Sequence, residues 1–229
     1  MLTSAADPAP GRQADQEALR PYAGLVGTWR GTGQVRRGSA KGAWTETVDW
    51  AWKLSSDAAG LELKVERGKY LRSAVLRPQD GSGRFVLEAI LADGAPRTFS
   101  GRAGERDKLV LTAAGPSAEG PRRITLTPLH DTRFLLLLEA QEADRGTYTR
   151  LGEVGYTRQG VTFAAGDSYP VCIVTEGRGT IPVSYQGRTY WVCCSGCKAL
   201  FEEDPEGVLA EYRAKRTPGN RIVLPNLPR

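Results

Sequence analysis

All four cysteines of this 229-residue chain lie in a single stretch near its C-terminal end. Cys172, Cys193 and Cys197 follow a C-x20-C-x3-C spacing, and Cys194 is adjacent to the second of them. Thiolates bind soft or borderline metal ions such as Zn(II) and Cu(I) in preference to hard cations. The residue types and their spacing therefore predict a metal site built from sulfur.

The sequence around the cysteines predicts how their sulfurs would meet. The aromatic and β-branched run that ends at Cys193 is typical of a strand, and Ser195-Gly196 is typical of a tight turn. Cys197 is then expected to open a helix, and Cys172 to approach from an earlier strand. Because neighbouring residues of a strand point to opposite faces, Cys194 joins the site only if the chain bends before it.

This stretch resembles the TRASH/YHS family of small treble-clef-like metal-binding modules, from about Asp167 to Lys215. The resemblance implies a small α+β module that binds a metal ion through its cysteines. Many family members carry a further cysteine three residues before Cys172, where this chain has Tyr169. The shared segments are Pro170-Val171-Cys172, a hairpin from Val183 to Tyr190, Cys193-Cys194-Ser195-Gly196-Cys197, Phe201 and Asp204-Pro205.

Three well-placed thiolates suit three-coordinate Cu(I), whereas zinc requires a fourth ligand from water, Cys194 or a partner. The expected ion is therefore zinc or copper(I), and the knuckle formed by Cys193 and Cys197 favours zinc. Two alternatives stay open, a disulfide pair and buried reduced thiols. The first function hypothesis is a non-enzymatic protein that senses, stores or transfers a soft metal ion.

From about residue 22 to residue 164, short strand-like runs alternate with turn signals. Leu61 to Glu66 alternates strictly between apolar and polar residues, and Trp50 and Trp52 are expected on one face of a strand. Phe134 to Leu138 is continuously apolar, which is typical of a strand buried on both sides. About ten such runs with no long helix predict a mainly β fold, an antiparallel up-and-down barrel followed by the small α+β module.

The first strand-like run contains Gly27-Thr28-Trp29-Arg30-Gly31-Thr32-Gly33, a G-x-W-x-G-x-G motif. This motif resembles the opening of lipocalin-like calycin barrels, most closely the nitrobindin-like group. The resemblance implies that Trp29 plugs the closed end and that the glycines let the strand bend. It also supports a second function hypothesis, a carrier of an apolar small molecule with the C-terminal module as a structural cap.

Nitrobindin-like proteins bind haem through an axial histidine, and the single histidine of this chain is His130. Pro128 before it and Asp131-Thr132 after it are typical of a turn, so we do not expect His130 to ligate haem. A catalytic triad or a histidine-based zinc-protease site would also have to use this one residue. We therefore expect a protein that is not an enzyme.

Composition excludes further classes. The formal charge of +5 comes without a dense Lys/Arg block, so nucleic-acid binding is not expected. No apolar run approaches about eighteen residues, so no membrane insertion is expected. Residues 1–16 lack the features of a signal peptide. The compartment stays open: we expect a soluble chain, extracytoplasmic if a signal was trimmed from it.

These patterns divide the chain into four parts. The expected parts are a flexible N-terminal segment (1–19), a lipocalin-like barrel (20–165), a TRASH/YHS-like module (166–216) and an extended tail (217–229).

Overall fold

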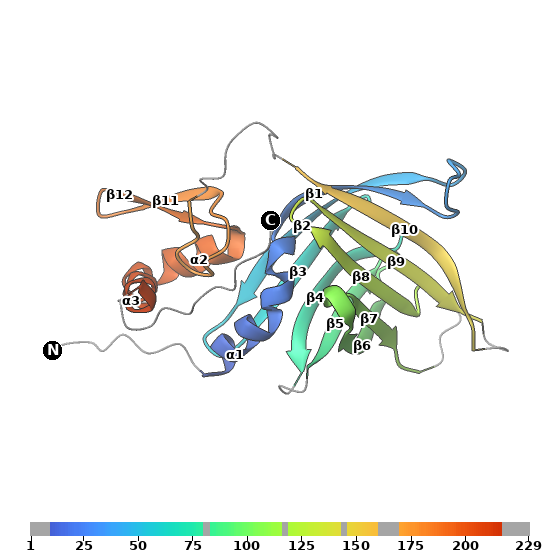
Figure 1. Ribbon diagram of the computed structural model, residues 1–229, viewed down its shortest axis with the longest axis horizontal. Helices are drawn as coiled ribbons and strands as arrows, with labels where there is room; N and C mark the ends of the chain where they lie inside the picture. Colours follow the sequence, from blue (N-terminus) through green and yellow to red (C-terminus); the bar gives the residue numbers. More distant parts are fainter. Residues whose placement is uncertain (1–9, 80–82, 116–118, 143–145, 160–169, 217–229) are drawn as a thin grey trace.

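The computed structural model of the chain describes residues 10–79, 83–115, 119–142, 146–159 and 170–216 (Figure 1). It contains a closed β-barrel and a small C-terminal module of two strands and two helices. The predicted fold class, a ten-strand antiparallel barrel followed by a small α+β module, is confirmed. The expected boundary at residue 166, Tyr169 and the expected tail over 217–229 lie outside the described residues.

The helices and strands follow one another in a simple order. A helix α1 (Pro10–Leu19) and a 3-10 turn η1 (Arg20–Leu25) precede the barrel. The module contains β11 (Ile181–Tyr185), β12 (Arg188–Val192), α2 (Ser195–Glu203) and α3 (Pro205–Arg216). The barrel strands are β1 (Gly27–Gln34), β2 (Trp44–Leu54), β3 (Ala59–Glu66), β4 (Leu71–Gln79), β5 (Arg84–Leu91), β6 (Pro96–Ala103), β7 (Leu109–Ala113), β8 (Arg123–His130), β9 (Arg133–Gln141) and β10 (Tyr148–Arg158), with a 3-10 turn η2 (Glu105–Asp107) between β6 and β7.

Each barrel strand pairs antiparallel with its neighbours in sequence, and β1 closes the barrel against β10. Apolar residues fill the interior, and Trp50 and Trp52 are both buried, as their shared face predicts. The apolar run of β9 is not buried on both sides, because Leu135 and Leu137 are only partly buried. A barrel wall has one inward face, so alternate residues of β9 remain on the outside.

The glycines of the G-x-W-x-G-x-G motif make room for aromatic rings. A Cβ atom at Gly31 would lie 2.6 Å from Tyr156 Cε1, and one at Gly33 would lie 2.2 Å from Trp44 Cε2. Both rings reach Glu46: Tyr156 OH donates to Oε1, and Trp44 Nε1 donates to Oε2 at 2.7 Å. Gly31 and Gly33 therefore have a role in packing, and Gly27, the first glycine of the motif, has a φ of 127°, a backbone conformation that glycine adopts readily.

Residues 10–19 form the helix α1, where the composition predicts a flexible segment. Helix α1 packs on β3 and β4, Leu19 is fully buried, and the Ala59 N–H donates to Asp15 Oδ2 at 3.0 Å. The expectation fails because the buried Leu19, the contact of Asp15 with β3 and an ion pair of 3.3 Å between Arg12 and Glu211 of α3 hold this helix. The Ala-, Gln- and Asp-containing sequence of α1 does not by itself indicate these contacts.

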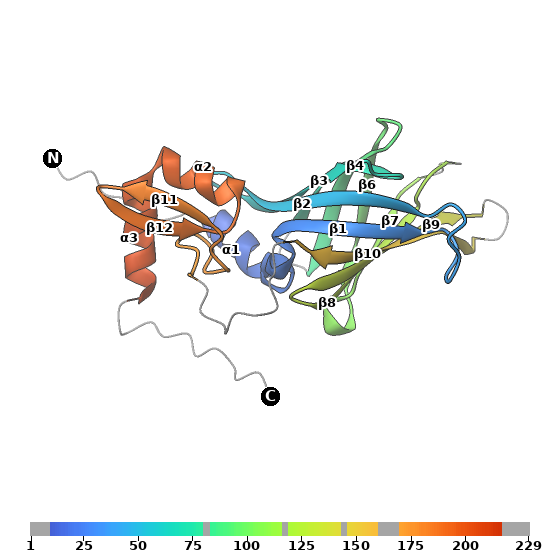
Figure 2. The ribbon, with the colours of Figure 1, turned by 90° about the horizontal axis from the view of Figure 1, so that it is seen from above.

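In both views the C-terminal module lies beside the barrel, with α1 near the junction (Figures 1 and 2). Strands β11 and β12 form a hairpin whose turn residues, Gln186 and Gly187, both have positive φ. Phe201 of α2 packs against the rings of Tyr185 and Tyr190. Asp204 caps α3, because its Oδ1 accepts the Gly207 N–H at 2.9 Å.

Candidate metal centre

Cys172 lies in a tight loop that begins directly after an isolated β-bridge between Val171 and Arg178. Its N–H donates to the Gly177 carbonyl at 2.7 Å, and its own carbonyl accepts the Glu176 N–H at 2.9 Å. These two bonds fold the chain back on itself and turn the Cys172 sulfur into the module, where the side chain is fully buried. Cys172 is expected on a strand, but the structure shows it as the first residue of a loop.

Cys193 and Cys194 form the bend that follows β12, and Cys194 is the N-cap of α2. The helix begins at Ser195, so the expected turn at Ser195-Gly196 is already helical, and Cys197 lies in the first helical turn rather than opening the helix. This early bend is the condition under which Cys194 could turn toward the other sulfurs. The thiols of Cys194 and Cys197 therefore both lie at a helix N-terminus, where the helix dipole stabilises thiolates.

The sulfurs of Cys172, Cys193 and Cys197 all lie within 4.8 Å of one another. Cys193 Sγ and Cys197 Sγ are 3.5 Å apart. Two thiolates bound to one zinc ion at about 2.3 Å in tetrahedral geometry would be separated by about 3.8 Å. The three sulfurs can therefore close on a single ion with small shifts, and each of the three residues is buried.

Cys194 occupies a different place in the cluster. Its sulfur is 3.8 Å from Cys193 Sγ, but it is not one of the three sulfurs that lie mutually within 4.8 Å. It accepts a hydrogen bond from the backbone N–H of Trp52 in β2, with an N···S distance of 3.3 Å. Cys194 thus touches the candidate metal ligands on one side and the barrel on the other.

Hydrogen bonds among the thiols shift their pKa values in opposite directions. Donation from Cys193, and next from Cys197, lowers the pKa of Cys172 to about 2 and that of Cys194 to about 3. Hydrogen bonding to Cys172 raises the pKa of Cys193 and of Cys197. The cluster thus holds negative charge on sulfur although burial opposes it, and the thiolate is the form of cysteine that binds metal ions.

Among the described residues, the hydroxyl of Thr175 lies next to the cluster. Thr175 Oγ1 lies 3.4 Å from Cys193 Sγ, within hydrogen-bonding distance for sulfur. Across the described part of the chain, the cysteine triad is the one group of three or more His, Cys, Asp or Glu side chains gathered closely enough for one ion. His130 is not part of it: the sequence predicts a turn position, but His130 is the exposed last residue of β8, paired with Arg133 of β9, with Nδ1 2.9 Å from Thr132 Oγ1.

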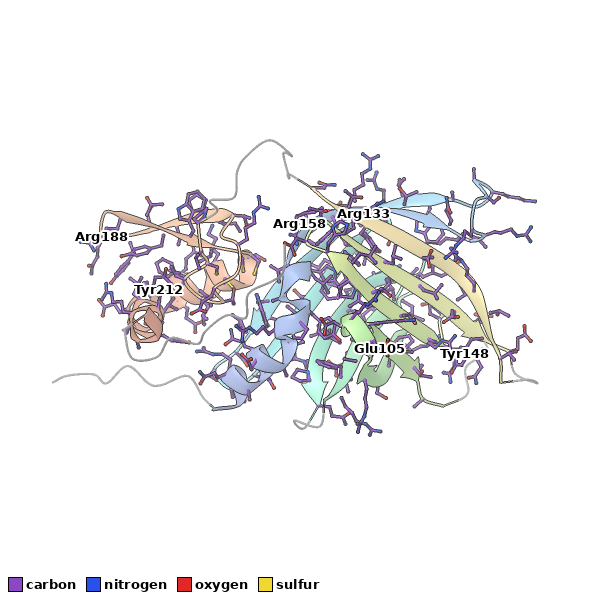
Figure 3. The ribbon with its side chains drawn as sticks, in the orientation of Figure 1. Glu105, Arg133, Tyr148, Arg158, Arg188 and Tyr212 are labelled. Carbon is purple, nitrogen blue, oxygen red and sulfur yellow. The ribbon has the colours of Figure 1, made fainter. Side chains whose placement is uncertain are left out.

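A second feature is an open cleft of about 940 Å³ at one end of the barrel. Its sides come from η1, the η2 loop and the β8–β9 turn, and Leu25, Trp29 and Phe134 contribute apolar surface. Glu105 and Arg133, labelled in Figure 3, are among its charged residues. No local sequence pattern indicates this cleft, because segments distant in sequence form it.

Comparison with known proteins finds no family model and no curated protein that matches this chain. No helix in the described ranges is long and apolar enough to span a bilayer. The function of the protein is therefore inferred from its own residues.

Proposed function

We propose that the protein is a non-enzymatic metal-binding protein that senses, stores or transfers a soft metal ion through a TRASH/YHS-like module. The observation that carries the proposal is the convergence of the Cys172, Cys193 and Cys197 sulfurs within 4.8 Å of one another. Cys172 comes from a loop that is distant in sequence from the bend that carries Cys193 and the helix start that carries Cys197, so the fold brings it to them. An all-sulfur donor set selects soft or borderline ions.

The arrangement favours a metal site over the two alternatives for these cysteines. A disulfide would join two sulfurs, whereas here at least three converge, and Cys193 Sγ and Cys197 Sγ are 3.5 Å apart with no bond between them. Inert buried thiols need no shared geometry, whereas the Cys172, Cys193 and Cys197 sulfurs lie within 4.8 Å of one another. Hydrogen bonds from Cys193 and Cys197 also lower the pKa of Cys172, although burial alone would raise it.

The choice between zinc and copper(I) depends on Cys194. The three mutually close sulfurs alone suit a three-coordinate Cu(I) ion. The 3.8 Å distance from Cys194 Sγ to Cys193 Sγ matches the separation of about 3.8 Å expected for two thiolates on one zinc ion, so Cys194 could supply a fourth ligand. We propose zinc as the ion, with copper(I) as the alternative.

Metal analysis of protein purified without chelator under reducing conditions tests the proposal. We expect one equivalent of metal in the wild type and loss of that equivalent in Cys172→Ser and Cys197→Ser. His130→Ala is the control, since it removes a potential ligand outside the cluster and should keep the metal. If both cysteine variants still bind one equivalent of metal, the assignment of the site is wrong. Competition against chelators of known affinity then separates zinc from copper(I), and tight Cu(I) binding that Cys194→Ser leaves unchanged would exclude the zinc choice.

A second candidate function, a lipocalin-like carrier with the module as a structural cap, is favoured by the open cleft near η1. Bulky buried side chains such as Trp50 and Phe85 occupy the barrel core, so the cleft is the better place for a ligand. Leu129, which lines it, is 51% exposed. Binding of an apolar fluorescent probe should weaken in Leu129→Arg but not in Ile90→Arg, an exposed apolar residue elsewhere on the barrel. Equal binding by both variants would dismiss the cleft as a carrier site.

A further inference from the structure

The edge of β2 loses its strand partner before β2 ends. Strand β1 pairs with β2 only as far as Gly27, which lies opposite Trp50. On the other side, β3 continues to pair with β2 as far as Leu54, opposite Ala59. A strand edge without a partner presents unpaired N–H and C=O groups, which need another acceptor or donor. Among the described residues, the segment of β2 after Trp50 therefore extends past β1 with one edge free of a strand partner.

The candidate metal centre covers this free edge. The Trp52 N–H donates to Cys194 Sγ at 3.3 Å, and both groups are buried. A Cβ atom at Gly196 would lie 1.7 Å from the Trp52 carbonyl oxygen, so the first turn of α2 rests directly on this peptide group. The side chain of Trp52 is itself 4% exposed. One residue of the barrel thus joins its buried core to the helix start that carries Cys194 and Cys197.

We propose that the edge of β2 at Trp52 is a positioning element of the metal centre, so that metal binding by the module and its docking on the barrel stabilise one another. The inference rests on the proposed metal-binding function. Cys193 and Cys197 flank the segment that touches Trp52, and an ion that fixes their sulfurs also fixes the backbone of residues 194–196. A docked helix start in turn holds these sulfurs in place. Such coupling between two binding events is reciprocal in free energy.

Gly196→Ala tests this linkage without altering any cysteine. The added methyl group would clash with the Trp52 carbonyl, while alanine favours the helix itself. We expect metal affinity, measured by chelator competition, to fall by about tenfold or more, within the usual range of coupling energies. Glu203→Ala is the matched control in the same helix, because it also introduces an alanine into α2 but at an exposed residue of the last turn, away from the segment that touches Trp52. Its affinity should match the wild type.

Amide hydrogen exchange at Trp52 supplies a readout that requires no variant. In the wild type the Trp52 amide should exchange about tenfold more slowly with metal bound than without it, because docking protects its N–H. Suppose that the wild-type protein binds metal but shows equal exchange in both states, and that Gly196→Ala binds metal as tightly as Glu203→Ala. This result would overturn the linkage and leave the proposed function standing. Wild-type protein that binds no metal would overturn the proposed function and the linkage with it.

Discussion

The guanidinium of Arg158 lies 4.1 Å from the centroid of the Trp29 ring, and it joins three segments at one end of the barrel. Its Nη1 donates to the Val26 carbonyl at 2.8 Å, its Nε donates to the Asp131 carbonyl at 2.7 Å, and its Nη2 donates to the Gly24 carbonyl. The indole Nε1–H of Trp29 donates to the Leu25 carbonyl at 2.7 Å. Arg158, labelled in Figure 3, therefore fastens η1 and the β8–β9 turn onto the tryptophan of the first strand.

Replacing Arg158 by alanine should lower the free energy of unfolding by about 2–4 kcal/mol. Three carbonyl groups lose a charged donor, and Trp29 loses a cation above its ring. Arg133→Ala, an exposed arginine on the neighbouring strand, should change the free energy by less than about 0.5 kcal/mol. Denaturant unfolding followed by tryptophan fluorescence measures both. Equal losses in the free energy of unfolding for the two variants would show that the contacts of Arg158 do not stabilise the barrel.

Gly31→Ala should destabilise the barrel by about 1–3 kcal/mol, because the new methyl group would overlap the Tyr156 ring and Val154. Its carbon would lie 2.6 Å from Tyr156 Cε1 and 2.7 Å from Val154 Cγ1. Gly155→Ala on the adjacent strand is the control, since its Cβ would meet Leu135 Cδ2 at an ordinary 3.6 Å. We expect that control to be neutral or more stable by up to about 1 kcal/mol. Thermal and denaturant unfolding compare the pair.

The barrel could be predicted because its signals are local. Leu61 and Leu63 are buried while Glu62 and Lys64, which alternate with them, are not, and this alternation is visible in a few residues. The partners of Gly31 and Gly33 could not be predicted, since the rings of Tyr156 and Trp44 come from other strands. The glycines of the motif indicate that a neighbouring group lies close to the backbone, but only the closed barrel shows which side chain that is.

The sequence predicts which cysteines form the candidate site, but it does not predict the contact between this site and the barrel. The spacing of Cys193 and Cys197 is local, and turn and helix signals surround both residues. The hydrogen bond from Trp52 to Cys194 spans 142 residues, so no local pattern indicates it. The helix begins at Ser195, earlier than expected, and Gly196 lies directly against the Trp52 peptide, a contact that the fold alone creates.

Two buried tyrosines should respond in opposite ways to loss of their hydroxyl groups at neutral pH. Tyr156→Phe leaves Glu46 Oε1 without its donor and should destabilise the barrel by about 1–3 kcal/mol. Tyr22 OH is buried without a hydrogen-bond partner among the described residues, so Tyr22→Phe should be neutral or stabilising by about 1 kcal/mol. Urea unfolding at pH 7 gives both values. A loss above about 1 kcal/mol in Tyr22→Phe would reveal a partner for that hydroxyl.

The same tyrosines should make the barrel sensitive to alkali. Burial, reinforced by Asp107, raises the pKa of Tyr22 to about 12, and burial with Glu46 raises the pKa of Tyr156 well above its ordinary value. A raised pKa means that the folded state holds the phenol proton more tightly than the unfolded state. This contribution is complete below about pH 10 and is lost as the pH rises toward 12 and beyond. The free energy of unfolding should therefore fall less steeply from pH 9.5 to 11.5 in Tyr22→Phe than in the wild type, and parallel profiles would contradict the assignment.

Metal removal should loosen the C-terminal module and spare the barrel. The module is small, and its core around Phe201 packs on a two-stranded hairpin, so we expect the ion to supply much of its stability. Chelation under reducing conditions should increase amide exchange over residues 171–209, while β5 to β9 keep their protection. Cys172→Ser without chelator should reproduce this pattern, because it removes a ligand while leaving the barrel sequence intact. Protection of the module that is equal with and without metal would show that its core is sufficient alone.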